Sequence, residues 1–221
     1  MAVAGKRVLV IGAQYGTEMV WALRNGAAEV VGLDPEGCPT DALEIALDRI
    51  GQGARKGNFR QVHATTHDAG DIGTFDYVMS NNVFEHIDGL SHTLASIARF
   101  MPAPGARAVI FADPLFYSSQ GHHLRAGSWQ HLTLSQDALR AQTPARQWDA
   151  YRSMLNGMTI TSFLGAVREA GMILLDLGVV PDRALAEFPA IRDNIPPGLK
   201  PMDLCIEGLV CTLAFPENIE G

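Results

Sequence analysis

Residues 7–36 constrain the fold of this chain more than any other segment. They contain a short apolar run (8–11), a glycine turn, a helical pattern and a second apolar run (30–33) that ends at Asp34. Short β-branched runs without polar alternation are typical of parallel strands that are buried on both faces. The order strand, glycine turn, helix, strand and acid predicts the nucleotide-binding unit of an α/β sheet.

The glycine turn indicates which kind of cofactor this unit binds. Gly12 and Gly16 allow the backbone to approach a ligand closely, and the following helix presents unpaired N–H groups. Asp34 lies about twenty residues past the turn, where a carboxylate can accept both ribose hydroxyls of an adenosine. The dinucleotide fingerprint needs a middle glycine against the pyrophosphate, and Gln14 stands there instead. The turn therefore disfavours NAD and favours a nucleoside cofactor without phosphates.

Two later blocks carry a resemblance to a known family. Residues 75–87 have the sequence FDYVMSNNVFEHI, and residues 101–111, MPAPGARAVIF, have a Pro-Gly turn before an apolar run. In this order after the glycine turn, they resemble the class I S-adenosylmethionine (SAM) methyltransferases. The resemblance implies SAM as cofactor and S-adenosylhomocysteine as product. It also implies a cofactor site drawn from Gly12, Ala13, Gln14, Gly16, Asp34, Asp68 and Asn81.

The chain departs from the family pattern at two positions. Val10 stands where the family often has an acid on the first strand, and Gln14 replaces the usual middle glycine. Either the methionine end of SAM is held differently here, or the site has lost activity. We expect the Gln14 amide to point out of the pocket or to bond the methionine carboxylate. Asp68 either accepts from the adenine amine or forms a turn before Gly70.

Alternating strand and helix patterns continue along the chain. Further strands are expected near 60–64, 75–80, 106–112, 172–180 and 204–215, with helices near 17–25, 40–50, 90–101 and 159–170 and a loop at 51–57. The pattern predicts one α/β domain over residues 1–221. The resemblance implies a seven-stranded, mostly parallel, doubly wound sheet whose last strand is antiparallel.

An insertion at residues 113–158 follows the fifth expected strand. It is too long for a simple connection and leaves the carboxyl end of a strand, where ligands bind in open α/β sheets. We expect it to be a lid that binds the acceptor. Its Tyr-Ser, Gly-His-His and Leu-Asn…Met-Thr stretches are similar to a bacterial methyltransferase subgroup that is associated with sugars, glycans and secondary metabolites.

Four residues are candidates for the chemistry. His122 and His123 could supply the general base that removes a proton from an acceptor hydroxyl, with His123 slightly favoured, or they could simply bond the loop backbone. Glu85 and His86 follow the fourth strand, where the family's active site lies. In this interpretation Glu85 orients the loop while His86 faces the acceptor. The alternative is a purely structural role for both residues.

A metal site and an aromatic platform are further alternatives. No metal is expected, because hard cations such as Mg²⁺ prefer carboxylate oxygens to imidazole. The alternative Mg²⁺ site would use His122, His123, His131, Glu85 and Asp113. The aromatic residues Trp129, Trp148 and Tyr151 could stack on a ring of the acceptor or form the small core of the lid.

Composition limits the partners and the compartment. The 17 basic and 24 acidic residues give a net charge of −7 without a Lys/Arg run, which disfavours nucleic acids. No signal peptide or membrane span is visible, and the three cysteines are expected to be reduced thiols, so we expect a cytoplasmic protein. The sequence leaves the oligomeric state open, with a homodimer among the alternatives.

The sequence therefore predicts SAM-dependent O-methylation of a small-molecule or glycan acceptor with a histidine base. An N-methyltransferase is one alternative, since a neutral amine needs no strong base. A non-catalytic subunit that keeps the SAM-binding fold is another, because of Gln14.

Overall fold

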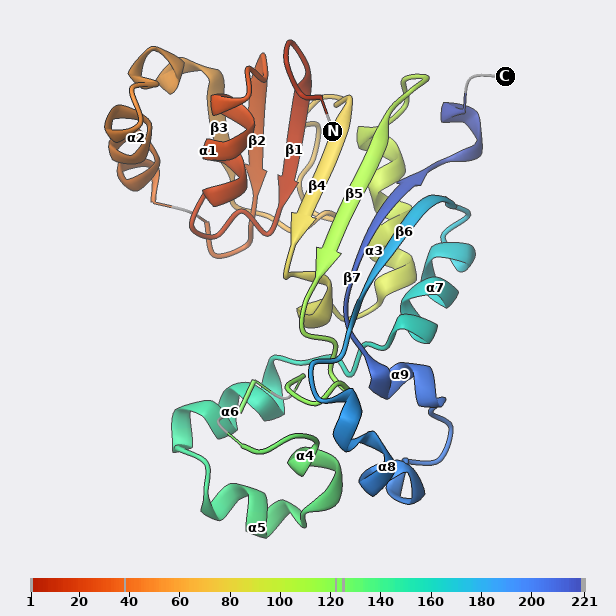
Figure 1. Ribbon diagram of the computed structural model, residues 1–221. Helices are drawn as coiled ribbons and strands as arrows, with labels where there is room; N and C mark the ends of the chain where they lie inside the picture. Colours follow the sequence, from red (N-terminus) through yellow and green to blue (C-terminus); the bar gives the residue numbers. More distant parts are fainter. Residues whose placement is uncertain (1, 38, 122, 125, 220–221) are drawn as a thin grey trace.

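The computed structural model describes residues 2–219 except 38, 122 and 125. Its core is one seven-stranded sheet in the order β3-β2-β1-β4-β5-β7-β6 (Figure 1). The strands are β1 (Arg7–Ile11), β2 (Glu29–Leu33), β3 (Phe59–Val62), β4 (Tyr77–Asn81), β5 (Arg107–Ala112), β6 (Ile173–Pro181) and β7 (Ile206–Ala214). β1 to β5 pair in parallel, and β7 runs antiparallel to both of its neighbours. This confirms the predicted fold class.

The strand patterns follow from burial on both faces of the sheet. On β1, Val8 and Val10 pack into one hydrophobic cluster, whereas Leu9 and Ile11 pack into another on the opposite face. Successive strand residues point to opposite faces, so an uninterrupted apolar run is needed where both faces are covered. Val10 stands where the family often has an acid. In this protein its side chain is part of the hydrophobic core.

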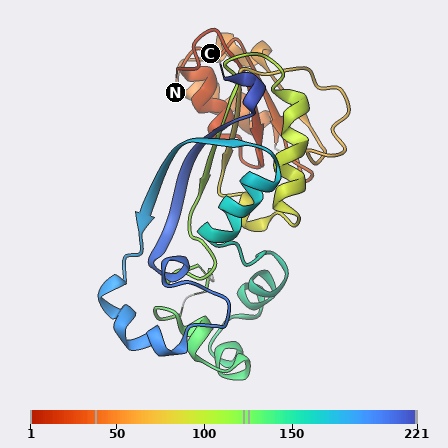
Figure 2. The same ribbon diagram turned by 90° about the vertical axis from the view of Figure 1, so that its right-hand side faces the viewer.

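Helices cover the two faces unequally. On one face α1 (Thr17–Arg24) and α2 (Thr40–Arg49) lie over the β1–β3 half of the sheet (Figure 1). On the other face lie α3 (Leu90–Ser96), which η3 (Ile97–Phe100) continues as a 3-10 turn, and α7 (Ile160–Glu169) (Figure 2). Three further 3-10 turns are η1 (Gly53–Asn58), where a loop was predicted, η2 (Phe84–His86) and η6 (Pro216–Asn218).

A helical subdomain lies beyond the carboxyl end of β5, and we call it the cap (Figure 1). Its first segment, residues 113–158, holds α4 (Gln130–Thr133), α5 (Gln136–Ala141) and α6 (Ala145–Ser153). Its second segment, residues 182–205, holds η4 (Leu185–Glu187), α8 (Phe188–Ile191), η5 (Arg192–Asn194) and α9 (Pro201–Cys205). No sequence pattern indicated that this second segment joins the first, and the strand expected from 204 begins only at Ile206.

Buried contacts join the two segments of the cap. Trp129 is fully buried, its ring meets Phe188 edge-on with centroids 6.2 Å apart, and its indole N–H donates to the Tyr117 carbonyl. The Ser119 amide donates to the buried Asp182 carboxylate at 2.6 Å. In the first segment, the Tyr151 ring stacks on another aromatic ring of the cap. Trp129 and Tyr151 therefore belong to the hydrophobic core of the cap, which is the alternative to stacking on a ring of the acceptor.

Among the described residues, no helix is both long and apolar enough to cross a membrane.

Candidate active site

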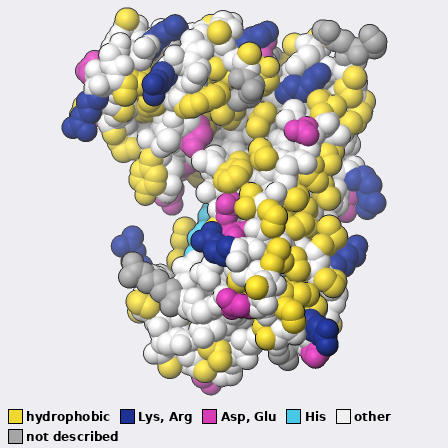
Figure 3. All heavy atoms as spheres, in the orientation of Figure 1, with side chains coloured by type: hydrophobic (Ala, Val, Ile, Leu, Met, Phe, Trp, Pro, Cys, Tyr) yellow, Lys and Arg dark blue, Asp and Glu magenta, His cyan; other side chains and the backbone are white. Residues whose placement is uncertain are grey.

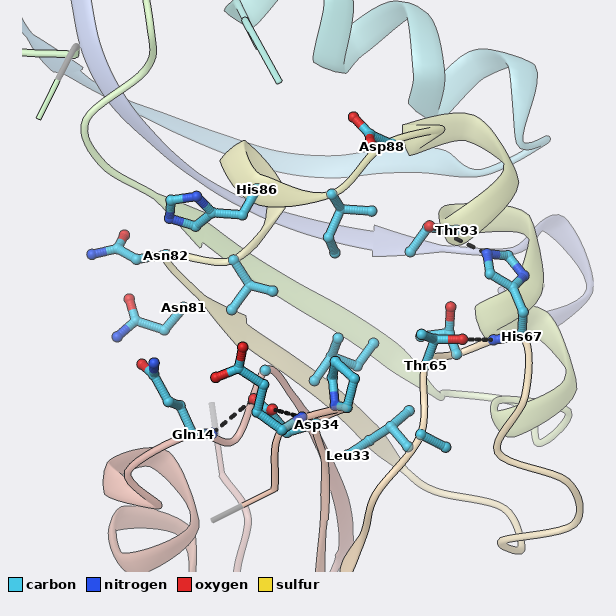
Figure 4. A pocket seen from close by; sticks show the side chains of 18 of the residues that line it. Gln14, Leu33, Asp34, Thr65, His67, Asn81, Asn82, His86, Asp88 and Thr93 are labelled. Atoms are coloured by element: carbon cyan, nitrogen blue, oxygen red, sulfur yellow. Dashed lines mark hydrogen bonds between the residues drawn. The ribbon is translucent and has the colours of Figure 1, made fainter. Parts of the chain in front are cut away.

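A cavity of about 510 Å³ opens at the carboxyl ends of β1, β2 and β4, between the sheet and the cap. Figure 3 shows the molecule hollowed at this level, with histidine atoms visible inside the hollow. Five of the residues predicted for the site line the cavity: Gly12, Gln14, Asp34, Asn81 and His86. Figure 4 labels all of them except Gly12. The volume is in the range of pockets for small ligands.

The glycine turn forms the floor of the cavity. Gly12 has a φ of 72°, and a Cβ built on it would overlap the methyl groups of Val83, so no larger residue fits there. Gly16 has a φ of 73° and immediately precedes α1. Ala13 is buried beneath the turn and does not line the cavity. The turn thus brings backbone close to the cavity without side chains in between.

Asp34 is held at the end of β2 by backbone amides. Its Oδ2 accepts from the Gln14 amide at 3.0 Å, and its Oδ1 accepts from the amides of Glu36 and Gly37 at 2.9 and 3.2 Å. The carboxylate is 8% exposed and faces the cavity (Figure 4). Three amides occupy three of the about four acceptor positions of the carboxylate, so Oδ2 can still accept a hydrogen bond from a ligand hydroxyl while Asp34 fixes the turn.

The walls of the cavity carry further polar groups. The Asn81 amide donates to Glu18 in the first turn of α1 at 2.7 Å, which fixes the amide at the cavity edge. Asp68 accepts from the Thr65 hydroxyl at 2.6 Å and does not line the cavity, whereas Thr65 and His67 do. The turn interpretation of Asp68 therefore fits its surroundings better than contact with a ligand.

Sequence reasoning missed Asn82, which links the ends of β4 and β5. It adopts a left-handed backbone conformation with a φ of 53°, and its backbone N–H donates to the Phe111 carbonyl. Its side-chain oxygen accepts from the Asp113 amide at 2.9 Å. A non-glycine residue with positive φ is uncommon, and asparagine is among the types that tolerate it best. That preference at a strand end was the one available signal.

The cap reaches the cavity at the turn after β4. His86 Nδ1 lies 2.7 Å from the Met154 carbonyl, and since a carbonyl only accepts, Nδ1 carries the proton. In the neutral ring Nε2 then keeps its lone pair. Asn156 fixes the same turn: its side-chain amide donates to the carbonyls of Phe84 and Ile87, both at 2.7 Å. The cap thereby holds the orientation of His86.

His123, the favoured base at the sequence level, lies beside His86 and not on the cavity wall. The two ring centroids are 5.8 Å apart. The residue as a whole is exposed, but desolvation of the ring and, second, the nearby His86 lower the pKa of His123. The ring is therefore neutral at pH 7 and able to accept a proton. His122 lies outside the described residues.

No group of three or more His, Cys, Asp or Glu among the described residues is arranged to hold a metal ion. Of the candidates for the alternative Mg²⁺ site, His131 is buried in α4 with its ring edge-on to Phe116, at 5.6 Å between centroids.

Glu85 is a buried carboxyl next to this turn. It is 1% exposed, and neither carboxyl oxygen bonds another described residue. Burial, with a smaller contribution from Asp113, raises the pKa of Glu85 to about 7. Glu85 does not line the cavity, and the orienting role of its side chain stays a prediction.

The pH dependence of stability should report on Glu85. The folded protein holds the Glu85 proton up to about pH 7, whereas the unfolded chain releases it near 4.5. The native state thus binds more protons between these values, and the free energy of unfolding falls as the pH rises from 4.5 to 7, by about 3 kcal/mol from this group. In urea unfolding from pH 5 to 8, Glu85→Gln should lack this fall. Equal pH slopes in both proteins would contradict the assignment.

The sheet order, the antiparallel β7 and a cavity above the glycine turn define the class I methyltransferase architecture. A family model described as a methyltransferase domain matches residues 2–175, so the chain belongs to this methyltransferase family. A comparison with curated proteins finds no match.

Solved structures give the same fold. A SAM-dependent methyltransferase from Mesorhizobium loti aligns over 96% of this chain and 92% of its own, with 16% identity and a TM-score of 0.56. A geranyl diphosphate methyltransferase in complex with SAM aligns over 96% and 79%, with 14% identity and a TM-score of 0.60. The [4+2]-cyclase SpnF aligns over 96% and 76%, with 13% identity and a TM-score of 0.58. At these identities the likeness concerns the fold alone.

Proposed function

We propose that the protein is a SAM-dependent methyltransferase that methylates an oxygen of a small-molecule or glycan acceptor. The observation that carries the proposal is the Asp34 carboxylate, which three backbone amides hold at the cavity floor. A fixed carboxylate at the end of the second strand suits a hydroxyl of a ribose.

The other cavity residues fit the remaining parts of SAM. Leu33 and Ile87 supply apolar surface for the adenine, and the side-chain amide of Asn81 suits the methionine carboxylate. SAM supplies a methyl group on a positively charged sulfur, and acidic groups around a cavity favour such a cation. Asp34 and Glu36 line this one.

His86 is the residue we propose as general base. It lines the cavity, and its Nδ1–H bond to Met154 leaves Nε2 free to take the proton of an acceptor hydroxyl. His123 is the second candidate, because it is close to His86 and neutral. Transfer of a methyl group requires mainly the alignment of nucleophile and methyl about 3 Å apart, so fixing the ring and the acceptor accounts for most of the catalysis. In this account residues 113–158 act as the acceptor-binding lid.

Two experiments test the proposal. The first is mass spectrometry of the denatured, purified protein, where we expect SAM or its demethylated product. The second is a screen of hydroxylated and amine acceptors with methyl-labelled SAM, where label should enter hydroxyl compounds. A protein that binds SAM and labels only amines would establish the N-methyltransferase alternative. Binding of SAM without transfer to any acceptor would favour the non-catalytic alternative.

The Gln14 side chain should be dispensable for cofactor binding. The bond from residue 14 to Asp34 uses the backbone amide, which a glycine also supplies. We therefore expect Gln14→Gly to change the SAM dissociation constant by less than about threefold, or less than about 0.7 kcal/mol. Calorimetric titration measures it. A loss of tenfold or more would mean that the Gln14 amide is itself a ligand of the methionine carboxylate.

Asn156 should be needed for turnover and not for SAM binding. Asn156→Ala removes the two side-chain hydrogen bonds from Asn156 to the turn that carries His86. A displacement of about 1 Å can cost on the order of 10² in rate. Asn218→Ala is the matched control, since Asn218 also donates to two backbone carbonyls, Met101 and Ala103. At a temperature where both variants are folded, only the first should lose turnover. Equal turnover in the two variants would show that Asn156 is only structural.

A further inference from the structure

Strand β6 is an uncovered edge of the sheet. It is the last strand in the order, and among the described residues β7 alone pairs with it, through all of its nine residues except the bulged Leu175 (Figures 1 and 2). Five of its apolar residues are between 36% and 45% exposed: Ile173, Leu174, Leu175, Val179 and Val180. An edge of this length presents a row of unpaired backbone N–H and C=O groups along about 30 Å.

The other edge of the same sheet shows how this protein treats an edge that faces solvent. β3 has only four residues, FRQV, and its Arg60 is exposed and paired with Glu29. Short strands and charged side chains prevent edges from pairing with other chains. β6 is more than twice as long, and Asp176 is its only charged residue. β3 therefore has the features of an edge that faces solvent, whereas β6 has the features of an edge that forms an interface.

The sheet face beside β6 is also bare. α1 and α2 cover only the β1–β3 half, and hydrophobic side chains gather over β5, β7 and β6 on the side that Figure 3 shows. Val210 of β7 is 41% exposed on this face, next to Gly178 of β6. Exposed apolar surface that runs continuously over neighbouring strands marks an interaction site in soluble proteins.

We propose that β6 pairs with β6 of a second copy of this chain, antiparallel about a two-fold axis at Leu177. The two sheets then form one continuous sheet, and the same surface serves both protomers, as a closed dimer requires. The proposal concerns assembly and is independent of the proposed methyl transfer.

The sequence of β6 selects this register over its neighbours. With the axis at Leu177, Leu175 lies opposite Val179 and Asp176 opposite Gly178, which has no side chain. The bulge between Leu174 and Asp176 limits this regular pairing to residues 175–179. With the axis at Asp176, two carboxylates would face each other, which is destabilising.

The register with the axis at Gly178 is also less favourable. It would place the exposed Val180 opposite the Asp176 carboxylate. Of these three registers, the axis at Leu177 alone pairs the exposed apolar residues with one another and keeps every carboxylate away from them. This complementarity of β6 with itself is what favours a second copy over an unrelated partner.

Sedimentation velocity of the full chain tests the assembly. The wild type should sediment as a dimer, and Leu175→Lys/Val179→Lys should sediment as a monomer, because each cross-strand pair would join lysines. Ile45→Lys, at a residue of α2 that is 51% exposed, is the matched control and should stay dimeric. Circular dichroism and the melting temperature verify that the double variant is folded. A monomeric wild type at the highest soluble concentration overturns the proposal.

Oxidative cross-linking tests the register and does not depend on the lysine variant. Leu177→Cys places two thiols directly opposite each other at the axis, within the range that a disulfide spans, whereas Asp176→Cys does not. In the first variant, mass spectrometry should find the peptide around position 177 linked by a disulfide to its own copy, and in the second variant no such link at position 176. The wild type, treated alike, controls for the native cysteines. A linked peptide only in the Asp176→Cys protein, or in neither, overturns the proposed pairing.

Discussion

Asp34→Ala should weaken SAM binding at least tenfold. The variant loses the hydrogen bond from a ribose hydroxyl to a carboxylate, which is worth about 1.5–3 kcal/mol, and tenfold in affinity is about 1.4 kcal/mol. It also leaves the amides of Gln14, Glu36 and Gly37 without their acceptor, so the glycine turn loses its support. Isothermal titration of the purified variant measures the effect.

Two further variants separate ligand contact from loss of structure. Asp34→Asn keeps one acceptor oxygen and removes the charge, so its affinity should lie between those of the wild type and the alanine variant. Asp41→Ala removes an exposed carboxylate of α2 that does not line the cavity, and it should bind SAM normally. Unchanged affinity in Asp34→Ala would remove the basis of the proposed cofactor site.

His86→Ala should lower turnover by about 10²–10⁴ at saturating SAM, which is what a positioned general base contributes. The SAM dissociation constant should stay within about twofold of the wild type, because the ring is proposed to act on the acceptor. The Nε2 lone pair is the group that would take the proton of the acceptor hydroxyl, and the alanine variant lacks it.

His123→Ala and His63→Ala complete this experiment. Loss of turnover in His123→Ala with a normal His86→Ala would make His123 the base. His63 is exposed and does not line the cavity, so His63→Ala should behave like the wild type. If both His86→Ala and His123→Ala keep normal turnover and the same pH profile, neither histidine acts as the base, and N-methylation becomes the better account.

The fold could be predicted from the sequence because its signals are local. The apolar runs of β1 and β2 have the composition of strands that are buried on both faces, and the glycines between them at 12 and 16 have positive φ. Asp34 could be placed for the same reason, since a strand end and a turn fix it within the segment 7–36. Helix α7 begins at a capping box formed by Thr159 and Ser162, where the helical pattern also begins.

The contacts between the cap and the sheet could not be predicted. His86 and Met154 are 68 residues apart, and no periodicity relates them. Asp182 joins the second cap segment to Ser119 across 63 residues. Residues 181–201 are rich in proline and show no pattern that would indicate this contact. The preference for His123 over His122 came from alternation within one segment, whereas the tautomer of His86 depends on a carbonyl from another segment. Such choices depend on tertiary contacts.

Calorimetric titration of the wild type with SAM and, separately, with NAD tests the central claim most directly. The account predicts saturable binding of SAM at one site per chain and no measurable binding of NAD, because Gln14 stands where a pyrophosphate needs glycine. Binding of NAD that is tighter than that of SAM, or no binding of SAM at all, would contradict it.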